Sequence, residues 1–230
     1  MPYTARTRTG LCLYPHPLEA VLNIVLCNGK GGSGKTTLTV LLAHALAEAG
    51  RTAAVLDLDP QRTTTKWLAE CEGTKVRKYE SGQDYDAVLV DTPPRLDTLS
   101  RSLAGCDLAV LVSSPSPADL WTTRDTAAAI RPLLRRGARL RLLFNGVQAH
   151  TVLSRELPDL AKRIGVQALS STISRRQVYQ HAALLGWTAL DQAAREELFK
   201  AALELVTIKQ QSKKVGKYDK RTTGQARGLT

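Results

Sequence analysis

Residues 23–49 read NIVLCNGKGGSGKTTLTVLLAHALAEA and carry the clearest structural signal in the chain. The apolar run at 24–27 is typical of a buried strand. Leucines at positions 38, 41, 42 and 46 recur at helical spacing directly after a glycine-rich turn. The turn contains the pattern G-x-x-x-x-G-K-T between Gly29 and Thr36. This stretch therefore predicts a strand, a phosphate-binding loop and a helix in immediate succession.

The chemistry of the loop follows from its residue types. Glycines allow backbone N–H groups to point inward at a phosphate, and the helix N-terminus adds its dipole. Lys35 supplies a point charge for the terminal phosphates, and the Thr36 hydroxyl is placed to ligate Mg²⁺. The sequence therefore predicts a nucleoside triphosphate site formed by Gly29, Lys30, Gly31, Gly32, Ser33, Gly34, Lys35, Thr36 and Thr37.

A second lysine, Lys30, lies inside the loop and gives it the form K-G-G-S-G-K-T-T. With this lysine the chain resembles the deviant Walker A ATPases of the ParA/MinD group. In that family the first lysine reaches across a nucleotide-sandwich dimer to the ATP of the partner subunit. The resemblance implies that Lys30 joins Lys35 as a catalytic residue, whereas the spacing alone is also compatible with a solvated lysine.

Two further motifs follow in the order of that family. D-L-D-P-Q at 57–61 ends one apolar run, and D-T-P-P at 91–94 ends another. Carboxylates at the carboxyl ends of parallel strands face the ligand crevice of the sheet. The resemblance implies that Asp59 is catalytic, orienting the attacking water and acting on Mg²⁺ through water, while Asp57 supports the site. Asp91 resembles a Walker B carboxylate that reaches Mg²⁺ through water, and the turn after it resembles a γ-phosphate-sensing switch.

The second half of the chain resembles the short ParF-like branch of plasmid-partition ParA proteins. The pattern P-x-P-x-D-L at 115–120 and the string I-S-R-R-Q-V-Y at 173–179 carry this resemblance. It implies that the helix after 117 lies at a dimer interface and that the loop at 173–179 flanks the nucleotide base. Asn145 follows an apolar run, and in MinD-like relatives an asparagine there bonds the adenine edge. A plain turn asparagine is the alternative.

The apolar pattern predicts one doubly wound α/β domain over residues 21–208, with a mostly parallel sheet flanked by helices. Lys75 to Tyr79 could form a short strand, but only residues 80–85 separate it from the next strand. We therefore expect an edge hairpin or a loop within 71–85. Strands are expected at 22–27, 52–57, 86–91, 107–112, 140–144 and 166–169, and helices at 35–49, 63–70, 118–136, 152–164 and 191–209.

The formal net charge of +11 favours a polyanionic partner. Residues 209–230 hold seven lysines and arginines against one aspartate, and we expect a disordered basic tail there. Residues 1–20 are expected to form an N-terminal extension. No apolar run approaches the length of a membrane span, and no signal peptide is evident. The cysteines lack metal-site spacing, which favours a reduced cytosolic protein; they are Cys12, Cys27, Cys71 and Cys106.

Together with the resemblance, these features imply an ATPase for plasmid or chromosome partition that uses ATP and Mg²⁺. It would form an ATP-dependent homodimer, bind DNA without sequence preference and be released when a small centromere-binding partner stimulates hydrolysis. We expect it in the cytoplasm on the nucleoid, away from the membrane. Few aromatic residues accompany the basic ones, so DNA contact would be made to phosphates. The candidates, each of which could equally be a solvated charge, are Arg131, Arg135, Arg136, Arg139, Arg141, Lys162, Arg163, Arg175 and Arg176.

Other functions compatible with the loop remain as alternatives. The same switch could position another cargo on the nucleoid, and the sequence barely separates this from plasmid partition. A metabolic synthetase of the same superfamily would have the phosphate loop but would not need Lys30. A nitrogenase-like reductase would require paired cluster-ligating cysteines, which this chain lacks.

Overall fold

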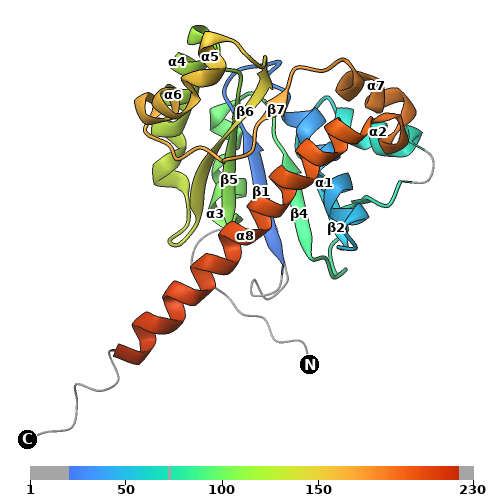
Figure 1. Ribbon diagram of the computed structural model, residues 1–230. Helices are drawn as coiled ribbons and strands as arrows, with labels where there is room; N and C mark the ends of the chain where they lie inside the picture. Colours follow the sequence, from blue (N-terminus) through green and yellow to red (C-terminus); the bar gives the residue numbers. More distant parts are fainter. Residues whose placement is uncertain (1–20, 72–73, 223–230) are drawn as a thin grey trace, which may run out of the picture.

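The computed structural model describes residues 21–71 and 74–222, so the expected extension at 1–20 lies outside them. The described residues form one sheet of parallel strands in the order β3-β2-β4-β1-β5-β6-β7 (Figure 1). The doubly wound parallel fold predicted from the sequence is therefore confirmed. The strands are β1 Leu22–Cys27, β2 Ala53–Asp57, β3 Arg77–Lys78, β4 Ala87–Asp91, β5 Leu108–Ser113, β6 Arg139–Val147 and β7 Ile173–Ser174.

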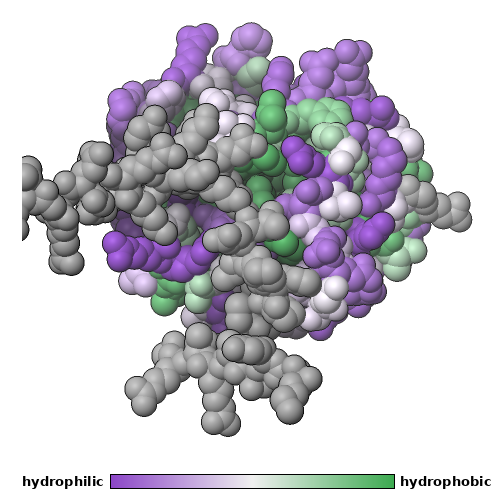
Figure 2. Space-filling model, turned by 90° about the horizontal axis from the view of Figure 1, so that it is seen from below, coloured by the Kyte–Doolittle hydropathy of each residue, from purple (hydrophilic) through white to green (hydrophobic). Residues whose placement is uncertain are grey.

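The order of the strands in the sheet reverses at β1, and this reversal marks the position of the ligand crevice. β1 pairs with β4 on one side and β5 on the other, with Leu26 opposite both Asp91 and Val110. In a doubly wound sheet, ligands bind outside the carboxyl ends of the strands at this reversal. These ends lie at the top of Figure 1. The lower face, seen in Figure 2, is hydrophilic around its rim and has a group of apolar residues near its centre.

Helices cover both faces of the sheet, as the burial pattern requires. The longer helices are α1 Lys35–Glu48, α2 Thr63–Glu70, α4 Pro117–Ile130, α6 Leu157–Ile164, α7 Val178–Leu185 and α8 Gln192–Thr222. α1, α2, α7 and α8 share one apolar core, and α3 (Ser100–Gly105), α4 and α6 share the other. α8 crosses the sheet alongside α1 (Figure 1). No helix among the described residues is both long enough and apolar enough to cross a membrane.

Two predicted edge features are corrected. β3 pairs in parallel with β2 through Ala54 and Val55, so the short strand considered at 75–79 forms, and the edge hairpin expected in 71–85 was wrong. The strand expected at 166–169 is reduced to a single bridge between Ala168 and Leu142. The strand that does pair with the end of β6 is β7, with Ile173 opposite Asn145.

Prolines explain two corrected helix boundaries. α4 ends at Ile130 and a 3₁₀ turn follows at Arg131–Leu133, because Pro132 has no N–H to continue the helix. The helix expected over 152–164 is divided into α5 (Val152–Arg155) and α6, in whose first turn Pro158 lies. α8 has no such interruption and continues to Thr222, which corrects the end predicted near 209 and takes in much of the segment expected to be disordered.

The cysteine prediction can be assessed for three residues. Cys27, Cys71 and Cys106 are buried and free. Burial raises the pKa of both Cys27 and Cys106 to about 12, so these thiols stay protonated near neutral pH. They are core residues without the low pKa that a reactive thiol needs. Trp67 of α2 is likewise buried.

Candidate nucleotide site

The glycine-rich loop has the backbone form that a phosphate cradle needs. Gly32 and Gly34 have φ values of +75° and +92°, a region that L side chains rarely adopt. Gly31 and Gly32 have open space where a side chain would lie. α1 begins at Lys35 with no side chain capping its first turn, so its N–H groups are available to an anion. The Ser33 hydroxyl is buried without a hydrogen-bond partner, which fits a loop that bonds phosphate oxygens.

Polar side chains fasten the start of the loop to the neighbouring elements. Asn28 Nδ2 donates to Val112 O at 2.8 Å and to Thr123 Oγ1 at 3.1 Å. The Gly29 N–H donates to Thr126 Oγ1 at 3.2 Å. Asn28, Thr123 and Thr126 are almost completely buried, so these bonds are shielded from water. They set the position of the loop relative to β5 and α4.

Lys35 is held inside the site. Its side chain is 6% exposed, and Nζ donates to the carbonyl of Lys30 at 3.1 Å, across the mouth of the loop. Burial lowers the pKa of Lys35, and the nearby carboxylates of Asp91 and Asp59 oppose this shift. A partly desolvated ammonium on the concave side of the loop is suited to meet phosphate oxygens.

Asp91 is a buried carboxylate with unused bonding capacity. It is 0% exposed, and burial raises its pKa to about 6, against the effect of bonds from Thr64 and Thr36. Thr64 Oγ1 donates to Oδ2 at 2.7 Å, while Oδ1 has no hydrogen-bond partner. A cation with its bound water would satisfy Oδ1 and favour the charged form. These residues therefore fit Mg²⁺ held by Thr36 and, through water, by Asp91.

Asp57 and Asp59 have different environments. Asp57 is buried and accepts from the Asp59 N–H at 3.1 Å, the Thr65 N–H at 2.9 Å and Thr65 Oγ1 at 2.8 Å. Its bonding capacity is used in shaping the turn, in agreement with the supporting role predicted for it. Asp59 is half-buried and accepts only from the Gln61 N–H, at 2.9 Å, among the bonds described. It keeps acceptor capacity for a water molecule.

Lys30 lies at the mouth of the site and is held by α4. Its side chain is 44% exposed, and Nζ forms an ion pair with Asp119, whose side chain is 16% exposed. Asp119 also accepts from Ser114 Oγ, and Ser116 caps α4 by accepting from the Asp119 N–H at 3.3 Å. The two loop lysines thus have opposite surroundings. The sequence marks Asp119 only as part of a motif and does not predict its pairing with Lys30.

Asn145 meets the loop directly. Its Nδ2 donates to the carbonyl of Ser33 at 2.9 Å, and a Cβ built on Gly34 would lie 2.2 Å from that nitrogen. The side chain therefore packs against the loop at the residue before α1. The predicted bond to an adenine edge stays a prediction, but Asn145 is at the site.

A cavity of about 550 Å³ joins these residues to a second wall. Loop residues 30–34, Thr37 and Asn145 are among the lining residues. The second wall is made by Ser174 of β7 and by residues that follow it, namely Arg175, Arg176, Tyr179 and Gln180. The expectation that the loop at 173–179 flanks a bound nucleotide agrees with this placement. Sequence reasoning missed Gln180 as a lining residue, and it missed the Glu197 that holds this segment.

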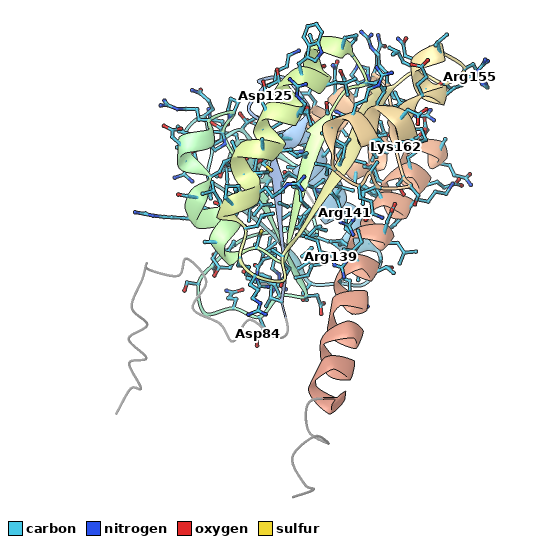
Figure 3. The ribbon with its side chains drawn as sticks, turned by 90° about the vertical axis from the view of Figure 1, so that its left-hand side faces the viewer. Asp84, Asp125, Arg139, Arg141, Arg155 and Lys162 are labelled. Atoms are coloured by element: carbon cyan, nitrogen blue, oxygen red, sulfur yellow. The ribbon has the colours of Figure 1, made fainter. Side chains whose placement is uncertain are left out.

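The predicted DNA contacts have unequal environments. Arg135 is tied to Asp107 and to the carbonyl of Cys106, and Arg176 is paired with Glu197. Both guanidiniums serve the fold, which argues against them as DNA contacts. Arg136 and Arg163 are exposed and form no ion pair with the described side chains. Figure 3 shows Arg139 and Arg141 of β6 on the same side of the molecule as Lys162 of α6 and Arg155 of α5.

Comparison with known proteins agrees with the fold and the loop. Residues 24–213 match the family described as "CobQ/CobB/MinD/ParA nucleotide binding domain". The chain is 32% identical over 182 residues to Maintenance of carboxysome distribution protein A of Gloeobacter kilaueensis, covering 73% of this chain and 83% of that protein.

Two solved structures illustrate the fold. The MinD cell division protein of Aquifex aeolicus has a TM-score of 0.67 and 19% identity, over 81% of this chain and 97% of that one. A variant of Cyanothece McdA in complex with ATP has a TM-score of 0.64 and 13% identity, over 82% of this chain and 97% of that one. With a family match that spans most of its length and the fold of the MinD/ParA-type ATPases, this chain belongs to the CobQ/CobB/MinD/ParA nucleotide-binding family.

Proposed function

We propose that this protein is a ParA-type ATPase that uses ATP and Mg²⁺ to control its own dimerisation. The observation that carries the proposal is the contrast between the two loop lysines. Lys35 is buried and faces the phosphate side of its own loop, whereas the Lys30 side chain is 44% exposed at the mouth. An exposed lysine on a long flexible side chain is free to leave Asp119 and to reach the ATP of a second copy.

The residues of the site have different roles in hydrolysis. The loop N–H groups and Lys35 bind the phosphates and neutralise their charge. Mg²⁺, when bound by Thr36 and through water by Asp91 and Asp59, supplies further positive charge to the phosphate oxygens. Asp59, half-buried with free acceptor capacity, orients the attacking water. Without a group to offset charge on the transferring phosphoryl, hydrolysis is slow, and a partner would accelerate it by supplying one.

In this proposal the ATP-bound dimer binds DNA through phosphate contacts, and hydrolysis releases it. The support is the basic surface beside β6, α5 and α6, where Arg136 and Arg163 remain unpaired among the described residues. The first cargo we propose is a plasmid or chromosome, linked by a small centromere-binding partner. On this hypothesis ATP hydrolysis times attachment and makes no metabolic product, and the protein works on the nucleoid in the cytoplasm.

A second cargo is favoured by one specific comparison. The relative from Gloeobacter kilaueensis is described as maintaining carboxysome distribution, and a solved neighbour is a McdA–ATP complex. The same ATP switch would then position a protein-bounded compartment instead of DNA. The two cargoes share the dimer and the DNA-binding steps and differ only in the partner that stimulates hydrolysis.

Light scattering with ATP, with ADP and without nucleotide tests the switch. We expect a dimer with ATP alone in the wild type and a monomer under every condition for Lys30→Ala. Lys75→Ala is a matched control, since Lys75 is also exposed and paired with a carboxylate, Glu48. It should dimerise normally. If the wild type stays monomeric with ATP, or if Lys30→Ala dimerises, the dimer proposal is wrong and a P-loop metabolic enzyme becomes the better hypothesis.

A further inference from the structure

One carboxylate on α8 holds the second wall of the nucleotide cavity. Glu197 Oε2 accepts from the Ser174 N–H at 2.9 Å and from Tyr179 OH at 2.8 Å. Oε1 accepts from Ser174 Oγ at 2.8 Å and from Arg176 Nη2 at 2.9 Å. Four donors from three residues of a single segment therefore converge on one side chain. Removing that side chain would release the segment at three points.

The residues held in this way face the cavity. Ser174, Arg176 and Tyr179 all line it, and none of them belongs to the glycine-rich loop. The phosphates belong at the loop, so the lining outside the loop is left for the nucleoside half of a nucleotide. The wall held by Glu197 is therefore separate from the groups that bind phosphate.

The charges of the cluster are balanced. Burial favours the neutral form of Glu197, but bonds from Arg176, Ser174 and Tyr179 outweigh it and keep the pKa of this carboxyl below its usual value. Burial and the bond to Glu197 raise the pKa of Tyr179, so its hydroxyl remains a donor. The positive charge of Arg176 is neutralised by its ion pair with Glu197. Arg175 is exposed on the cavity wall and forms no ion pair with the described side chains.

We propose that Glu197 is a positioning residue for nucleotide binding, acting through Ser174, Arg176 and Tyr179 to hold the nucleoside side of the cavity closed. The inference rests on the proposed function, since it concerns the same site. α8 also packs along α1, the helix that begins at Lys35 (Figure 1). One helix thus supports both the loop and the nucleoside wall. Glu197 accepts four of the hydrogen bonds from that wall, and the Ala194 carbonyl accepts a longer one from Tyr179 OH at 3.5 Å.

The matched control lies on the same helix. Glu204 accepts from the Ser170 N–H at 2.8 Å and from the Ser171 N–H at 2.9 Å, just before β7. It does not line the nucleotide cavity. Glu204→Gln and Glu197→Gln therefore make the same chemical change on one helix, and both disturb backbone bonds of the connection into or through β7. Only the second reaches the cavity wall.

The experiment measures binding of MgATP and of magnesium tripolyphosphate to the full chain by calorimetry. Tripolyphosphate has the phosphates of ATP without the nucleoside. For Glu197→Gln we expect ATP affinity to fall about tenfold, the equivalent of one charge-assisted contact, with tripolyphosphate affinity unchanged. For Glu204→Gln we expect wild-type affinity for both. Tyr179→Phe, which removes one donor and keeps the ring, should weaken ATP alone by a smaller factor.

Each outcome of these binding measurements either supports or overturns the role proposed for Glu197. Unchanged ATP affinity in Glu197→Gln, or an equal loss for ATP and tripolyphosphate, would overturn it. If Glu197→Gln does not fold in a urea titration, Tyr179→Phe decides: a loss confined to ATP supports the inference and unchanged ATP affinity overturns it. A wild type that binds neither ligand contradicts the proposed function itself, which is a separate outcome from wild-type binding with unaffected variants.

Discussion

Gly34 sits where the loop, α1 and Asn145 meet, and it has two reasons to be glycine. Its φ of +92° is unfavourable for an L side chain, and a Cβ would lie 2.2 Å from Asn145 Nδ2. Gly32 has the first reason alone, with φ of +75° and nothing nearby. Substitutions at these two glycines therefore separate the loss of stability caused by a left-handed backbone from the loss caused by steric crowding.

We expect Gly32→Ala to lower the free energy of unfolding by about 1–2 kcal/mol, the usual cost of a left-handed residue. Gly34→Ala should lower the free energy of unfolding by more than Gly32→Ala does. In an Asn145→Ala background the extra cost of Gly34→Ala should largely disappear, because the crowded atom has gone. Urea unfolding without nucleotide measures all four variants. Equal costs for the two glycines would show that the loop moves away from Asn145 freely.

His44 is a buried histidine on α1 with no role in the site. It is 3% exposed, stacks on Trp187 with ring centroids 5.9 Å apart, and has Nε2 3.2 Å from Thr74 Oγ1. Burial lowers the pKa of His44 to about 4, with Glu48 opposing. Its unfolded value is about 6.5, so the unfolded state binds the proton first as the pH falls.

Stability from the neutral His44 is therefore fully present above pH 6.5 and is lost as the pH falls toward 4, by up to about 3 kcal/mol. Urea unfolding at pH 7 and pH 5 should show a smaller loss for His44→Gln than for the wild type. Carboxylates that titrate in the same range, including Asp91, contribute equally to the pH dependence of both proteins. Their contribution therefore cancels when the wild type and His44→Gln are compared. A pH dependence identical in both proteins would contradict the assignment.

The positions of site residues were predictable where a motif places them at the end of a strand. Asp57, Asp59 and Asp91 follow apolar runs, and parallel strands bring such ends together at one edge of the sheet. Glu197 gives no such signal. It is one of several charged residues on a long helix, and its partners 174–179 lie about twenty positions away along the chain. Only the tertiary structure makes it a neighbour of the nucleotide site.

At the scale of elements, α4 connects the mouth of the site to the loop. Thr123 and Thr126 hold the loop start, and Asp119, one turn earlier, holds Lys30. The ion pair is partly exposed, so it contributes about 0.5–1 kcal/mol at most. In the proposed dimer Lys30 must leave Asp119, and that cost opposes dimerisation.

Asp119→Asn tests this cost. It keeps the size of the side chain but removes the charge, so we expect dimerisation to need about two- to fivefold less ATP, with little change in unfolding free energy. Light scattering over an ATP titration measures the change. Weaker dimerisation in Asp119→Asn would instead show that the carboxylate is needed within the dimer.

The elements that the sequence left open or did not predict are those with weak local signals. β3 and β7 each span two residues, too few for a periodic pattern to define, and their positions depend on what pairs with β2 and β6. The long buried strands β1, β4 and β5 were predicted within about one residue, because continuous apolar runs mark parallel strands covered on both faces.

At the scale of the molecule, charge lies on one edge of the sheet beside β6 (Figure 3). If this surface binds DNA phosphates, affinity with ATP should fall steeply between low and physiological salt. Arg136→Gln with Arg163→Gln should weaken binding and reduce the salt slope by about two. The control is Lys75→Gln with Arg77→Gln, which removes equal charge at the opposite edge, around β3. Retention that does not depend on salt would exclude phosphate contact.

The two pairs of substitutions change the total charge equally, so a general effect of net charge would affect both alike. A loss confined to the pair beside β6 locates the surface. An equal loss for both pairs would show that the attraction is not tied to this edge.

α1 follows directly after the phosphate-binding loop and is enclosed within the fold. Eleven of its fourteen residues are buried, since the sheet covers one side and α8 the other. A helix enclosed in this way has no solvent-facing side to absorb mutations. Few sequences can therefore occupy it, and drift in this protein must be concentrated elsewhere. Over evolutionary time α1 should change as slowly as the phosphate loop before it, because packing limits the helix as strictly as chemistry limits the loop.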